Sequence, residues 1–184
     1  MPTKVHALTV KGKVPGLLRV IASDVEIHGF GTNTSIKIAG IWDTGATGSV
    51  ITLKVINHLG IKPSGIVEVH TANGKVIKNT YDISIKLPNN VMINGIVATE
   101  ADALSGGCDA LIGMDIIGLG DFSITNYNGN TCMSFRLPSQ KEIDYVKTIS
   151  TSNSIIDRHK QAGLSLNSKC ICGSGKKFKN CHGK

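Results

Sequence analysis

The chain of 184 residues is predicted to fold as one all-β domain, followed by a short connector and a small cysteine-rich tail. Before Pro138, short alternating or apolar segments are separated by turn residues, which is typical of β-strands. The character of the sequence changes after Pro138, where apolar residues recur near helical spacing. Because 41% of the residues are hydrophobic but only 4% are aromatic, we expect an aliphatic core. The predicted parts are a β domain over residues 1–137, a helical or flexible connector over 138–168 and a tail over 169–184.

Two strands and one helix are predicted in the first third of the chain. Val5–Val10 alternates and precedes the turn residues 11–13. Ser35–Trp42 mixes β-branched and apolar residues with few polar ones, as expected of a well-buried strand. Thr52–Leu59 is predicted to be helical and to end at Gly60, because glycine commonly follows the last turn of a helix.

A β-hairpin is predicted in the next segment. Ile66–Thr71 and Lys75–Ile77 flank Ala72, Asn73 and Gly74, and Asn-Gly is the strongest short signal for a hairpin turn. The tip of such a hairpin would be mobile. An ordinary surface turn is an equally good interpretation of the same residues.

Further strands are predicted up to the end of the β domain. Tyr81–Leu87 precedes a Pro-Asn-Asn turn, and Val91–Ile93 follows it. Phe122–Thr125 and Thr131–Phe135 flank the turn residues 128–130 and are expected to form a closing hairpin.

The connector has a weaker helical pattern. Its apolar positions near helical spacing are Ile143, Val146, Ile149 and the pair at 155–156. Five polar residues, Ser150–Ser154, interrupt this pattern. We therefore expect one or two short helices or a flexible connector, followed by a linker over residues 163–168.

Asp43, Thr44 and Gly45 directly follow the predicted strand Ser35–Trp42. Gly45 can take backbone angles that a larger residue cannot, and the Thr44 hydroxyl can hydrogen-bond to neighbouring backbone. The sequence therefore places one carboxylate on a rigid loop at the tip of an apolar strand. Asp-Thr-Gly occurs once, and Asp-Ser-Gly does not occur.

A single carboxylate on such a loop implies a second one nearby. Two carboxylates within hydrogen-bond reach cannot both ionise cheaply, so one keeps a proton while the other stays charged. The charged one can take a proton from a water molecule while its partner polarises a peptide carbonyl, which gives hydrolysis without a covalent intermediate or a catalytic cofactor. We therefore expect a homodimer in which Asp43 of each chain faces the other across a two-fold axis.

Leu111–Gly113 resembles the apolar-apolar-Gly segment that packs beneath the catalytic loop of aspartic peptidases. Together with Asp-Thr-Gly-Ala, it makes residues 1–137 similar to the retropepsin-like aspartic peptidases, the single-lobed, dimeric relatives of the two-lobed pepsins. The resemblance implies a single-lobed acid-protease β-barrel that acts on peptides. It also implies that Asp43 is catalytic and that Thr44 and Gly45 shape its loop.

The resemblance further implies that the predicted hairpin is a flap that closes over bound peptide. Extended peptide would lie between this flap and the catalytic floor, held by backbone hydrogen bonds and side-chain pockets. Under this interpretation the residues that contact substrate are Ala46 in the floor and Ala72, Asn73 and Gly74 in the flap.

Two positions depart from the retroviral pattern. Thr47 stands where the retroviral enzymes usually carry Asp, and Met114 and Asp115 follow Leu-Ile-Gly where those enzymes usually carry Arg. The ion pair between those two positions cannot form here, so we expect other contacts to stabilise the dimer.

The tail contains four potential metal ligands: Cys170, Cys172, Cys181 and His182. Three thiols and one imidazole suit tetrahedral zinc. The segment resembles the SEC-C motif, a small zinc-binding tail best known from the bacterial protein-export motor ATPase. Because it has almost no apolar residues, we expect it to be disordered without zinc, which would be structural. A redox or free-thiol tail is the alternative.

Charge and cysteine content limit the partners and the compartment. Five of the seven net positive charges lie in residues 169–184. This basicity is a solvated surface or a docking site for an acidic protein or a nucleic acid. Five cysteines without a disulfide framework indicate a reducing compartment, and a bacterial cytoplasm fits best. We find no run of apolar residues that would span a membrane and no signal peptide.

The leading hypothesis is therefore a cytoplasmic, homodimeric aspartic endopeptidase whose zinc tail recruits a partner or substrate. A rival hypothesis is a catalytically weak or inactive peptide-binding or dimerisation module with a SEC-C adaptor tail. A third is a zinc-dependent nucleic-acid accessory protein, whose binding would be sensitive to salt.

Overall fold

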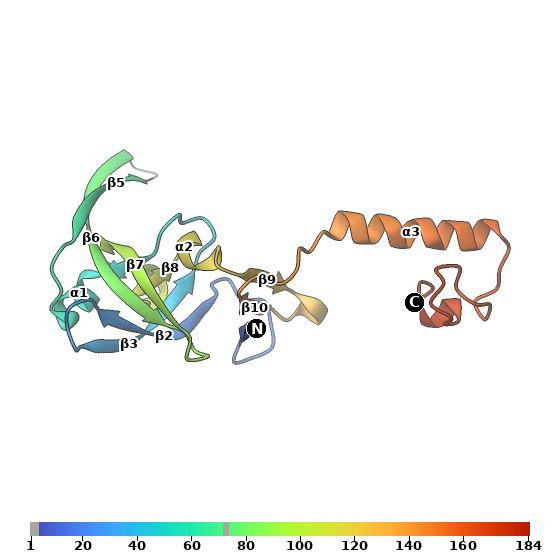
Figure 1. Cartoon of the computed structure of the whole chain (residues 1–184), viewed down its shortest axis with the longest axis horizontal. Coiled ribbons are helices and arrows are strands. Elements are labelled where there is room, and N and C mark those ends of the chain that lie inside the picture. The colour runs from blue at the N-terminus through green and yellow to red at the C-terminus, as the bar shows by residue number, and fades with distance from the viewer. Residues whose placement is uncertain (1–3, 72–73) are drawn as a thin grey trace. The chain divides into compact units, whose positions relative to one another are not determined.

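The structure of the protein is a computed structural model and describes residues 4–71 and 74–184 (Figure 1). The chain divides into two compact units, Met1–Gln140 and Lys141–Lys184. The first unit is built almost entirely of β-strands, so the predicted all-β fold class is confirmed. Among the described residues, no helix combines the length and the apolar character needed to cross a bilayer.

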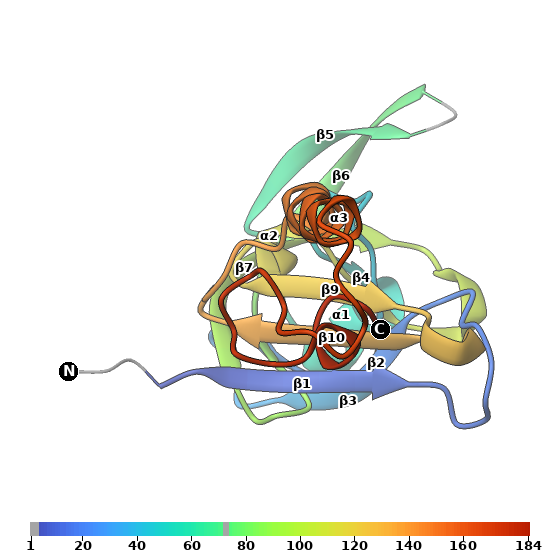
Figure 2. The same cartoon turned by 90° about the vertical axis from the view of Figure 1, so that its right-hand side faces the viewer.

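The strands of the first unit form two sheets. The smaller sheet has the order β1–β10–β9 and consists of β1 (His6–Lys11), β10 (Cys132–Leu137) and β9 (Asp121–Thr125). Figure 2 shows these three strands side by side. All pairs in this sheet are antiparallel, and the predicted closing hairpin corresponds to β9 and β10.

The larger sheet has the strand order β2–β3–β8–β4–β7–β6–β5, and β2 also pairs with β6. Six strands therefore form a closed ring, and β5 extends from it beside β6. The seven strands are β2 (Ala22–Gly29), β3 (Ser35–Trp42), β4 (Val50–Thr52), β5 (Gly65–Thr71), β6 (Gly74–Lys86), β7 (Met92–Ala101) and β8 (Ala110–Ile112). The predicted strand at 35–42 coincides with β3.

Short helices occupy the connections of the first unit: α1 (Leu53–Leu59), α2 (Met114–Ile117) and the 3₁₀ turns η1 (Ser105–Gly107) and η2 (Tyr127–Gly129). The predicted helix is confirmed as α1. It ends at Gly60, which has a φ of 65° and whose amide donates to the carbonyl of Ile56 at 3.0 Å. Glycine is favoured there because it adopts the left-handed conformation without a Cβ clash.

The core of the ring is largely aliphatic. Its side chains with no exposed surface include Ile27, Ile51, Ile85, Ile112 and Ile116. An aromatic cluster joins the ring to the smaller sheet, because Trp42 at the end of β3 lies 5.9 Å from Phe122 and 5.2 Å from Phe135 between ring centroids. The indole of Trp42 also donates a hydrogen bond to the Ser23 hydroxyl at 2.9 Å. This packing fixes the strand that leads into Asp43.

The second unit contains one continuous helix, α3 (Tyr145–Gln161). One helix was among the expected alternatives, although at 17 residues it is longer than the short helix expected. The alternatives of two helices or a flexible segment are wrong for this stretch. The hydroxyls of Thr148 and Thr151 are satisfied within the helix, since each donates to the carbonyl four residues earlier. Asp144 caps the helix by accepting a hydrogen bond from the Lys147 amide at 2.9 Å.

The C-terminal half of α3 packs against the cysteine-rich segment. Ile155 is buried with Cys170 and Phe178, and Phe178 begins the 3₁₀ turn η3 (Phe178–Asn180). The His159 ring stacks on Phe178 with a centroid distance of 3.7 Å and an interplanar angle of 8°. The Ser168 carbonyl accepts a hydrogen bond from the Phe178 amide and the Leu166 carbonyl accepts one from the Lys179 amide, so the predicted linker over 163–168 is hydrogen-bonded to the cysteine-rich segment.

Candidate active site and metal-binding cluster

The Asp43 loop begins where β3 ends and is supported by β8. These two strands run parallel, with Trp42 opposite Ile112. The Asp43 amide continues the ladder by donating to the Ile112 carbonyl at 3.0 Å. The loop is thus attached to a strand from 70 positions along the chain, and the predicted role of Leu111–Gly113 beneath it agrees with this geometry.

Gly45 holds the Asp43 carboxylate. Its amide donates to Oδ1 of Asp43 at 2.8 Å, and a Cβ on Gly45 would lie 3.1 Å from the same oxygen. Gly45 does not have a positive φ, so the expectation that it is needed for an unusual backbone angle is wrong. Glycine is favoured by the close approach of the carboxylate instead. Thr44 is exposed at the tip of the loop, and Ala46 is half-buried.

Gly113 fits against the end of the same loop. A Cβ at this position would lie 2.5 Å from both the carbonyl carbon and the oxygen of Gly48, so any larger residue would displace backbone. The following amide, that of Met114, donates to the Ala46 carbonyl at 2.8 Å. The segment 112–114 therefore contacts the loop along its length, from residue 43 to residue 48.

Asp115 and Ser49 form a further contact between this segment and the end of the loop. The sequence did not indicate this role for either residue. The Asp115 carboxylate accepts hydrogen bonds from the Ser49 amide at 2.9 Å and the Ser49 hydroxyl at 2.8 Å. The Ser49 hydroxyl in turn accepts from the Gly113 amide at 3.2 Å. The retroviral ion pair cannot form between position 47 and positions 114–115. A contact between the Asp115 carboxylate and Ser49 connects these two segments instead. The available signal was the position of Asp115, two residues after Leu-Ile-Gly.

Replacing Ser49 by alanine is expected to lower the free energy of unfolding by about 1–3 kcal/mol. Ser49 is only 1% exposed, so the change leaves the buried Gly113 amide without its acceptor and removes one of the two hydrogen bonds that Oδ1 of Asp115 accepts. Urea unfolding of both proteins measures the difference. Ser105→Ala, at an exposed serine, serves as the control and should change stability by less than about 0.5 kcal/mol. Equal losses in the two variants would contradict the assignment.

The predicted hairpin is formed by β5 and β6, which pair from Gly65 opposite Thr80 to Thr71 opposite Gly74. Gly74 has a φ of 115°, which glycine tolerates. Ala72 and Asn73, the other predicted flap residues, lie outside the described residues. The described part of the hairpin, β5 with the first half of β6, extends away from the ring (Figure 1).

The hairpin presents apolar side chains to solvent. Ile66 and Ile77 are 73% and 72% exposed, and the strand register places both on the same face of the hairpin. Exposed isoleucines on a paired ribbon are available to contact an apolar ligand.

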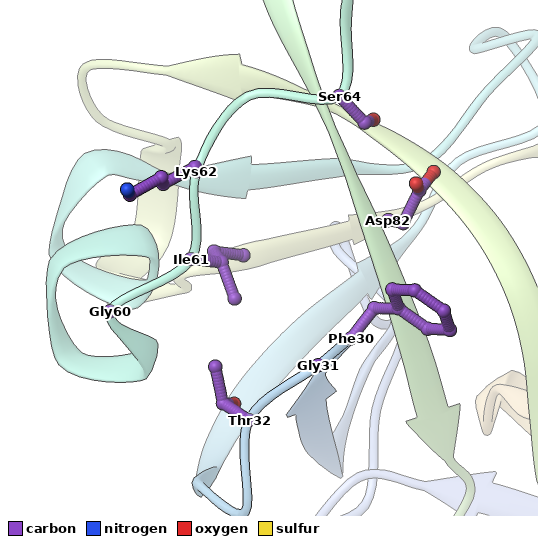
Figure 3. Close-up of a pocket in the computed structure, with 8 residues that line it drawn as sticks. All are labelled: Phe30, Gly31, Thr32, Gly60, Ile61, Lys62, Ser64 and Asp82. Carbon is purple, nitrogen blue, oxygen red and sulfur yellow. The ribbon is translucent and has the colours of Figure 1, made fainter.

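A cavity of about 350 Å³ lies near the end of α1 (Figure 3). Its lining residues are Phe30, Gly31, Thr32, Gly60, Ile61, Lys62, Ser64 and Asp82. None of them is a predicted catalytic, substrate-binding or metal-binding residue. The cavity therefore does not mark the site that the sequence predicts.

The four predicted metal ligands gather in the second unit, and their ligand atoms all lie within 4.8 Å of one another. The sulfurs of Cys172 and Cys181 are 3.6 Å apart, and Nδ1 of His182 lies 3.3 Å from the Cys170 sulfur and 3.2 Å from the Cys181 sulfur. Two thiolates on one tetrahedral zinc ion, each with a Zn–S distance of about 2.3 Å, would be about 3.8 Å apart. The donor set and its spacing therefore fit zinc.

Two of the thiols have shifted acidities. Hydrogen bonds to the side chain and then the backbone of Ser174 lower the pKa of Cys172 to about 6. Burial raises the pKa of Cys170. Since the thiolate is the form that ligates metals, the environment of Cys172 favours the ligating form at neutral pH.

Two family models match the chain. Residues 24–118, just over half of the chain, match the model of the gag-polyprotein putative aspartyl protease family, and residues 167–184 match the SEC-C motif. No curated protein matches the chain.

Several solved protease structures are similar to the chain. A retropepsin-like aspartic protease from Rickettsia conorii has 16% identity and a TM-score of 0.47 over 74% of this chain and 96% of that one. The EIAV protease complexed with an inhibitor has 21% identity and a TM-score of 0.45 over 55% and 88%. The protease of Simian Foamy Virus has 16% identity and a TM-score of 0.37 over 52% and 92%.

Proposed function

Because the chain belongs to the gag-polyprotein putative aspartyl protease family and carries a SEC-C motif, we propose that it is a homodimeric aspartic endopeptidase with a zinc-binding recruitment tail. The observation that carries this proposal is the Asp43 loop, which β8 and Gly113 hold rigidly and which each chain supplies once. Two chains are needed to bring two such loops together.

In the proposed mechanism the two Asp43 carboxylates share one proton, because two negative charges within hydrogen-bond reach of each other repel strongly. The ionised carboxylate takes a proton from a water molecule, and this water attacks the peptide carbonyl. The protonated carboxyl donates to the carbonyl oxygen as the tetrahedral intermediate forms. The Gly45 amide orients each carboxylate by its hydrogen bond to Oδ1.

Peptide would bind in an extended conformation between Ala46 in the loop and the β5–β6 hairpin, to which Ala72, Asn73 and Gly74 belong. Backbone hydrogen bonds would supply affinity, and the exposed Ile66 and Ile77 would favour apolar side chains in the substrate.

The second unit would hold a structural zinc ion through Cys170, Cys172, Cys181 and His182. Zinc would stabilise the fold of this unit and take no part in the hydrolysis. Its basic surface would dock on an acidic protein or substrate. All five cysteines are free, which supports the further proposal that the protein works in a reducing compartment such as the cytoplasm.

Mixing wild-type chains with Asp43→Asn chains tests the shared site. In an equimolar mixture whose dimers exchange freely, the activity per wild-type chain should fall to about half, because half of the wild-type chains then lack an acidic partner. The cleavage rate of a fluorogenic peptide gives the activity, and sedimentation velocity gives the mass of the assembly.

Wild-type activity that stays proportional to wild-type concentration in the mixture would contradict the dimeric site. Peptide binding that is unaltered by Asp43→Asn, without any cleavage by the wild type, would instead identify a binding module. Inhibition by a statine-type transition-state mimic would support the proposed chemistry.

A further inference from the structure

Glu100 is a carboxylate that points to the core side of a strand. In β7 the side chains of Ile96 and Ala98 are buried, at 7% and 0% exposure, whereas that of Val97 is 54% exposed. Because side chains alternate along a strand, Glu100 continues the inward row. It also lies beside Ile51 of β4, which has no exposed surface. A carboxylate in such a place is costly unless its oxygens accept hydrogen bonds.

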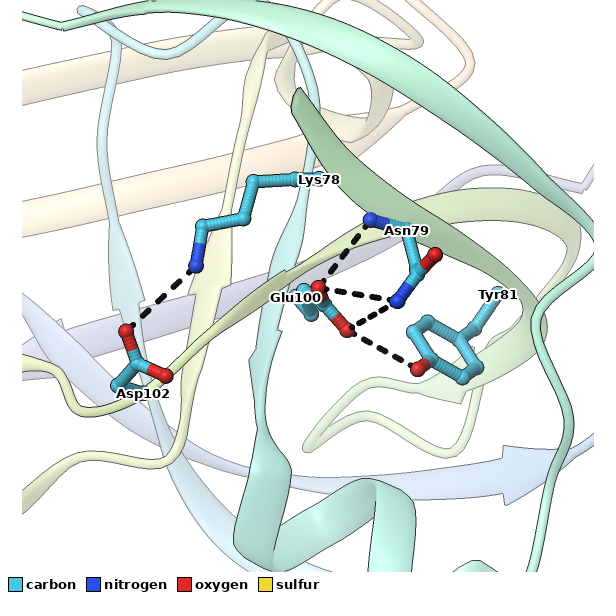
Figure 4. Close-up of polar contacts among 5 residues, drawn as sticks. All are labelled: Lys78, Asn79, Tyr81, Glu100 and Asp102. Carbon is cyan, nitrogen blue, oxygen red and sulfur yellow. Dashed lines mark hydrogen bonds and ion pairs between the residues drawn. The ribbon is translucent and has the colours of Figure 1, made fainter. Parts of the chain in front are cut away.

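Two residues of β6 supply these hydrogen bonds (Figure 4). The backbone amide of Asn79 donates to Oε1 of Glu100 at 3.2 Å, and Nδ2 of the Asn79 side chain donates to both oxygens at 3.1 Å. The hydroxyl of Tyr81, a residue that is only 4% exposed, donates to Oε2 at 3.0 Å. Burial raises the pKa of Glu100, but these hydrogen bonds outweigh that effect and lower it below its ordinary value.

This contact lies between the base of the hairpin and the Asp43 loop. Asn79 pairs with Ile66 of β5, so it belongs to the first rungs of the hairpin. On the other side, the residue before Glu100 donates its amide to the Ser49 carbonyl at 3.0 Å. Ser49 is the residue that Asp115 holds at the end of the loop. A short path of backbone and side-chain contacts therefore connects the loop to the hairpin through Glu100.

We propose that Glu100 is a positioning residue that fixes the base of the β5–β6 hairpin relative to the Asp43 loop, so that the hairpin meets bound peptide in one register. The expected effect on peptide cleavage rests on the proposed peptidase function, whereas the expected effect on the stability of the hairpin does not. Without the carboxylate, Asn79 and Tyr81 lose their shared acceptor, and the hairpin loses the side-chain hydrogen bonds that attach it to Glu100 of β7. The Asp43 loop keeps its own contacts with Gly113 and Asp115.

The test compares Glu100→Ala and Tyr81→Phe with wild type in the full chain, in the presence of zinc. Tyr81→Phe keeps the buried ring and removes one hydrogen bond, so it remains informative if Glu100→Ala folds poorly. Asp102→Asn is the matched control, because this nearby acid is 84% exposed and makes only a surface ion pair with Lys78 at 3.5 Å. Glu100→Gln, which keeps one acceptor oxygen, tests whether part of the effect of Glu100→Ala is restored by a side chain of similar shape.

The first measurement is amide hydrogen exchange, which does not depend on activity. Glu100→Ala should speed exchange in residues 65–71 and 74–80 by about tenfold, Tyr81→Phe less and Asp102→Asn not at all. Exchange in β2 and β3 should stay as in wild type. Unchanged exchange in the hairpin, or an equal increase in β2, β3 and the hairpin, would overturn the proposal.

The second measurement is peptide cleavage. Glu100→Ala should raise KM by about tenfold with a much smaller change in kcat, and Glu100→Gln should recover part of the loss. A fall in kcat of about tenfold without a change in KM would overturn the positioning role. If wild type cleaves no peptide, the peptidase proposal fails, and the exchange measurement still decides whether Glu100 holds the hairpin.

Discussion

Asp43→Asn should lower kcat/KM for peptide cleavage by about 10³-fold or more. Asparagine has nearly the shape of aspartate, and its side-chain oxygen can still accept the hydrogen bond that Gly45 donates to Oδ1. It cannot, however, ionise to take a proton from water, nor can two asparagines share a proton. The chemistry should therefore be lost while the loop, which Ile112 and Gly113 support, keeps its structure.

The cleavage comparison is best made with a peptide library at several pH values from acidic to neutral. Asp24→Asn is a suitable control, because Asp24 is an exposed aspartate of β2 outside the loop, and this change should leave cleavage unaltered. The thermal midpoint and the solution mass of each variant show whether the fold and assembly are preserved. Equal cleavage by wild type and Asp43→Asn would rule the mechanism out.

Cys172→Ser should abolish stable zinc binding and unfold the cysteine-rich segment. The apolar core of this segment is small, with Ile155, Cys170 and Phe178 as its buried members. Structural zinc contributes about 10–16 kcal/mol in small zinc-binding peptides, far more than such a core can supply. Removing one of the four ligands should therefore cause loss of ordered structure and not a modest decrease in stability.

Zinc content by mass spectrometry and amide exchange over residues 163–184 measure this effect. Cys132→Ser is the matched control, because Cys132 is a half-buried thiol in β10 and is not one of the four clustered ligands. That control should retain one zinc ion per chain and slow exchange. A chelator should reproduce the effect of Cys172→Ser in the wild-type protein. Slow exchange over 163–184 in metal-free protein would contradict the assignment of zinc as the stabilising ion.

Local patterns in the sequence were sufficient to predict several elements. The largely apolar segment Ser35–Trp42 and the glycine at position 60 correctly predicted β3 and the end of α1, because each signal lies within the element or directly beside it. Asp43 and Leu111–Gly113 were predicted to lie together from the resemblance to a family, and the pairing of β3 with β8 places them so.

Features that depend on distant contacts could not be predicted. The hydrogen bonds of Glu100 require the register of β6 on β7, and those of Asp115 require the fold of the loop. The interruption predicted at Ser150–Ser154 was wrong because the helix is completed by packing of its later turns on Phe178. Gly45 was assigned a backbone-angle role, although the constraint is the space beside the Asp43 carboxylate.

The stacking of His159 on Phe178 affects how the C-terminal region can be used in isolation. A peptide that begins at Lys169 contains all four ligands but would leave Phe178 uncovered, because the faces that shield it belong to α3. A transferable recruitment module would therefore have to start at Lys141, where the second unit begins. Grafting the last sixteen residues alone onto another protein would transfer the metal ligands without the surface that keeps them folded.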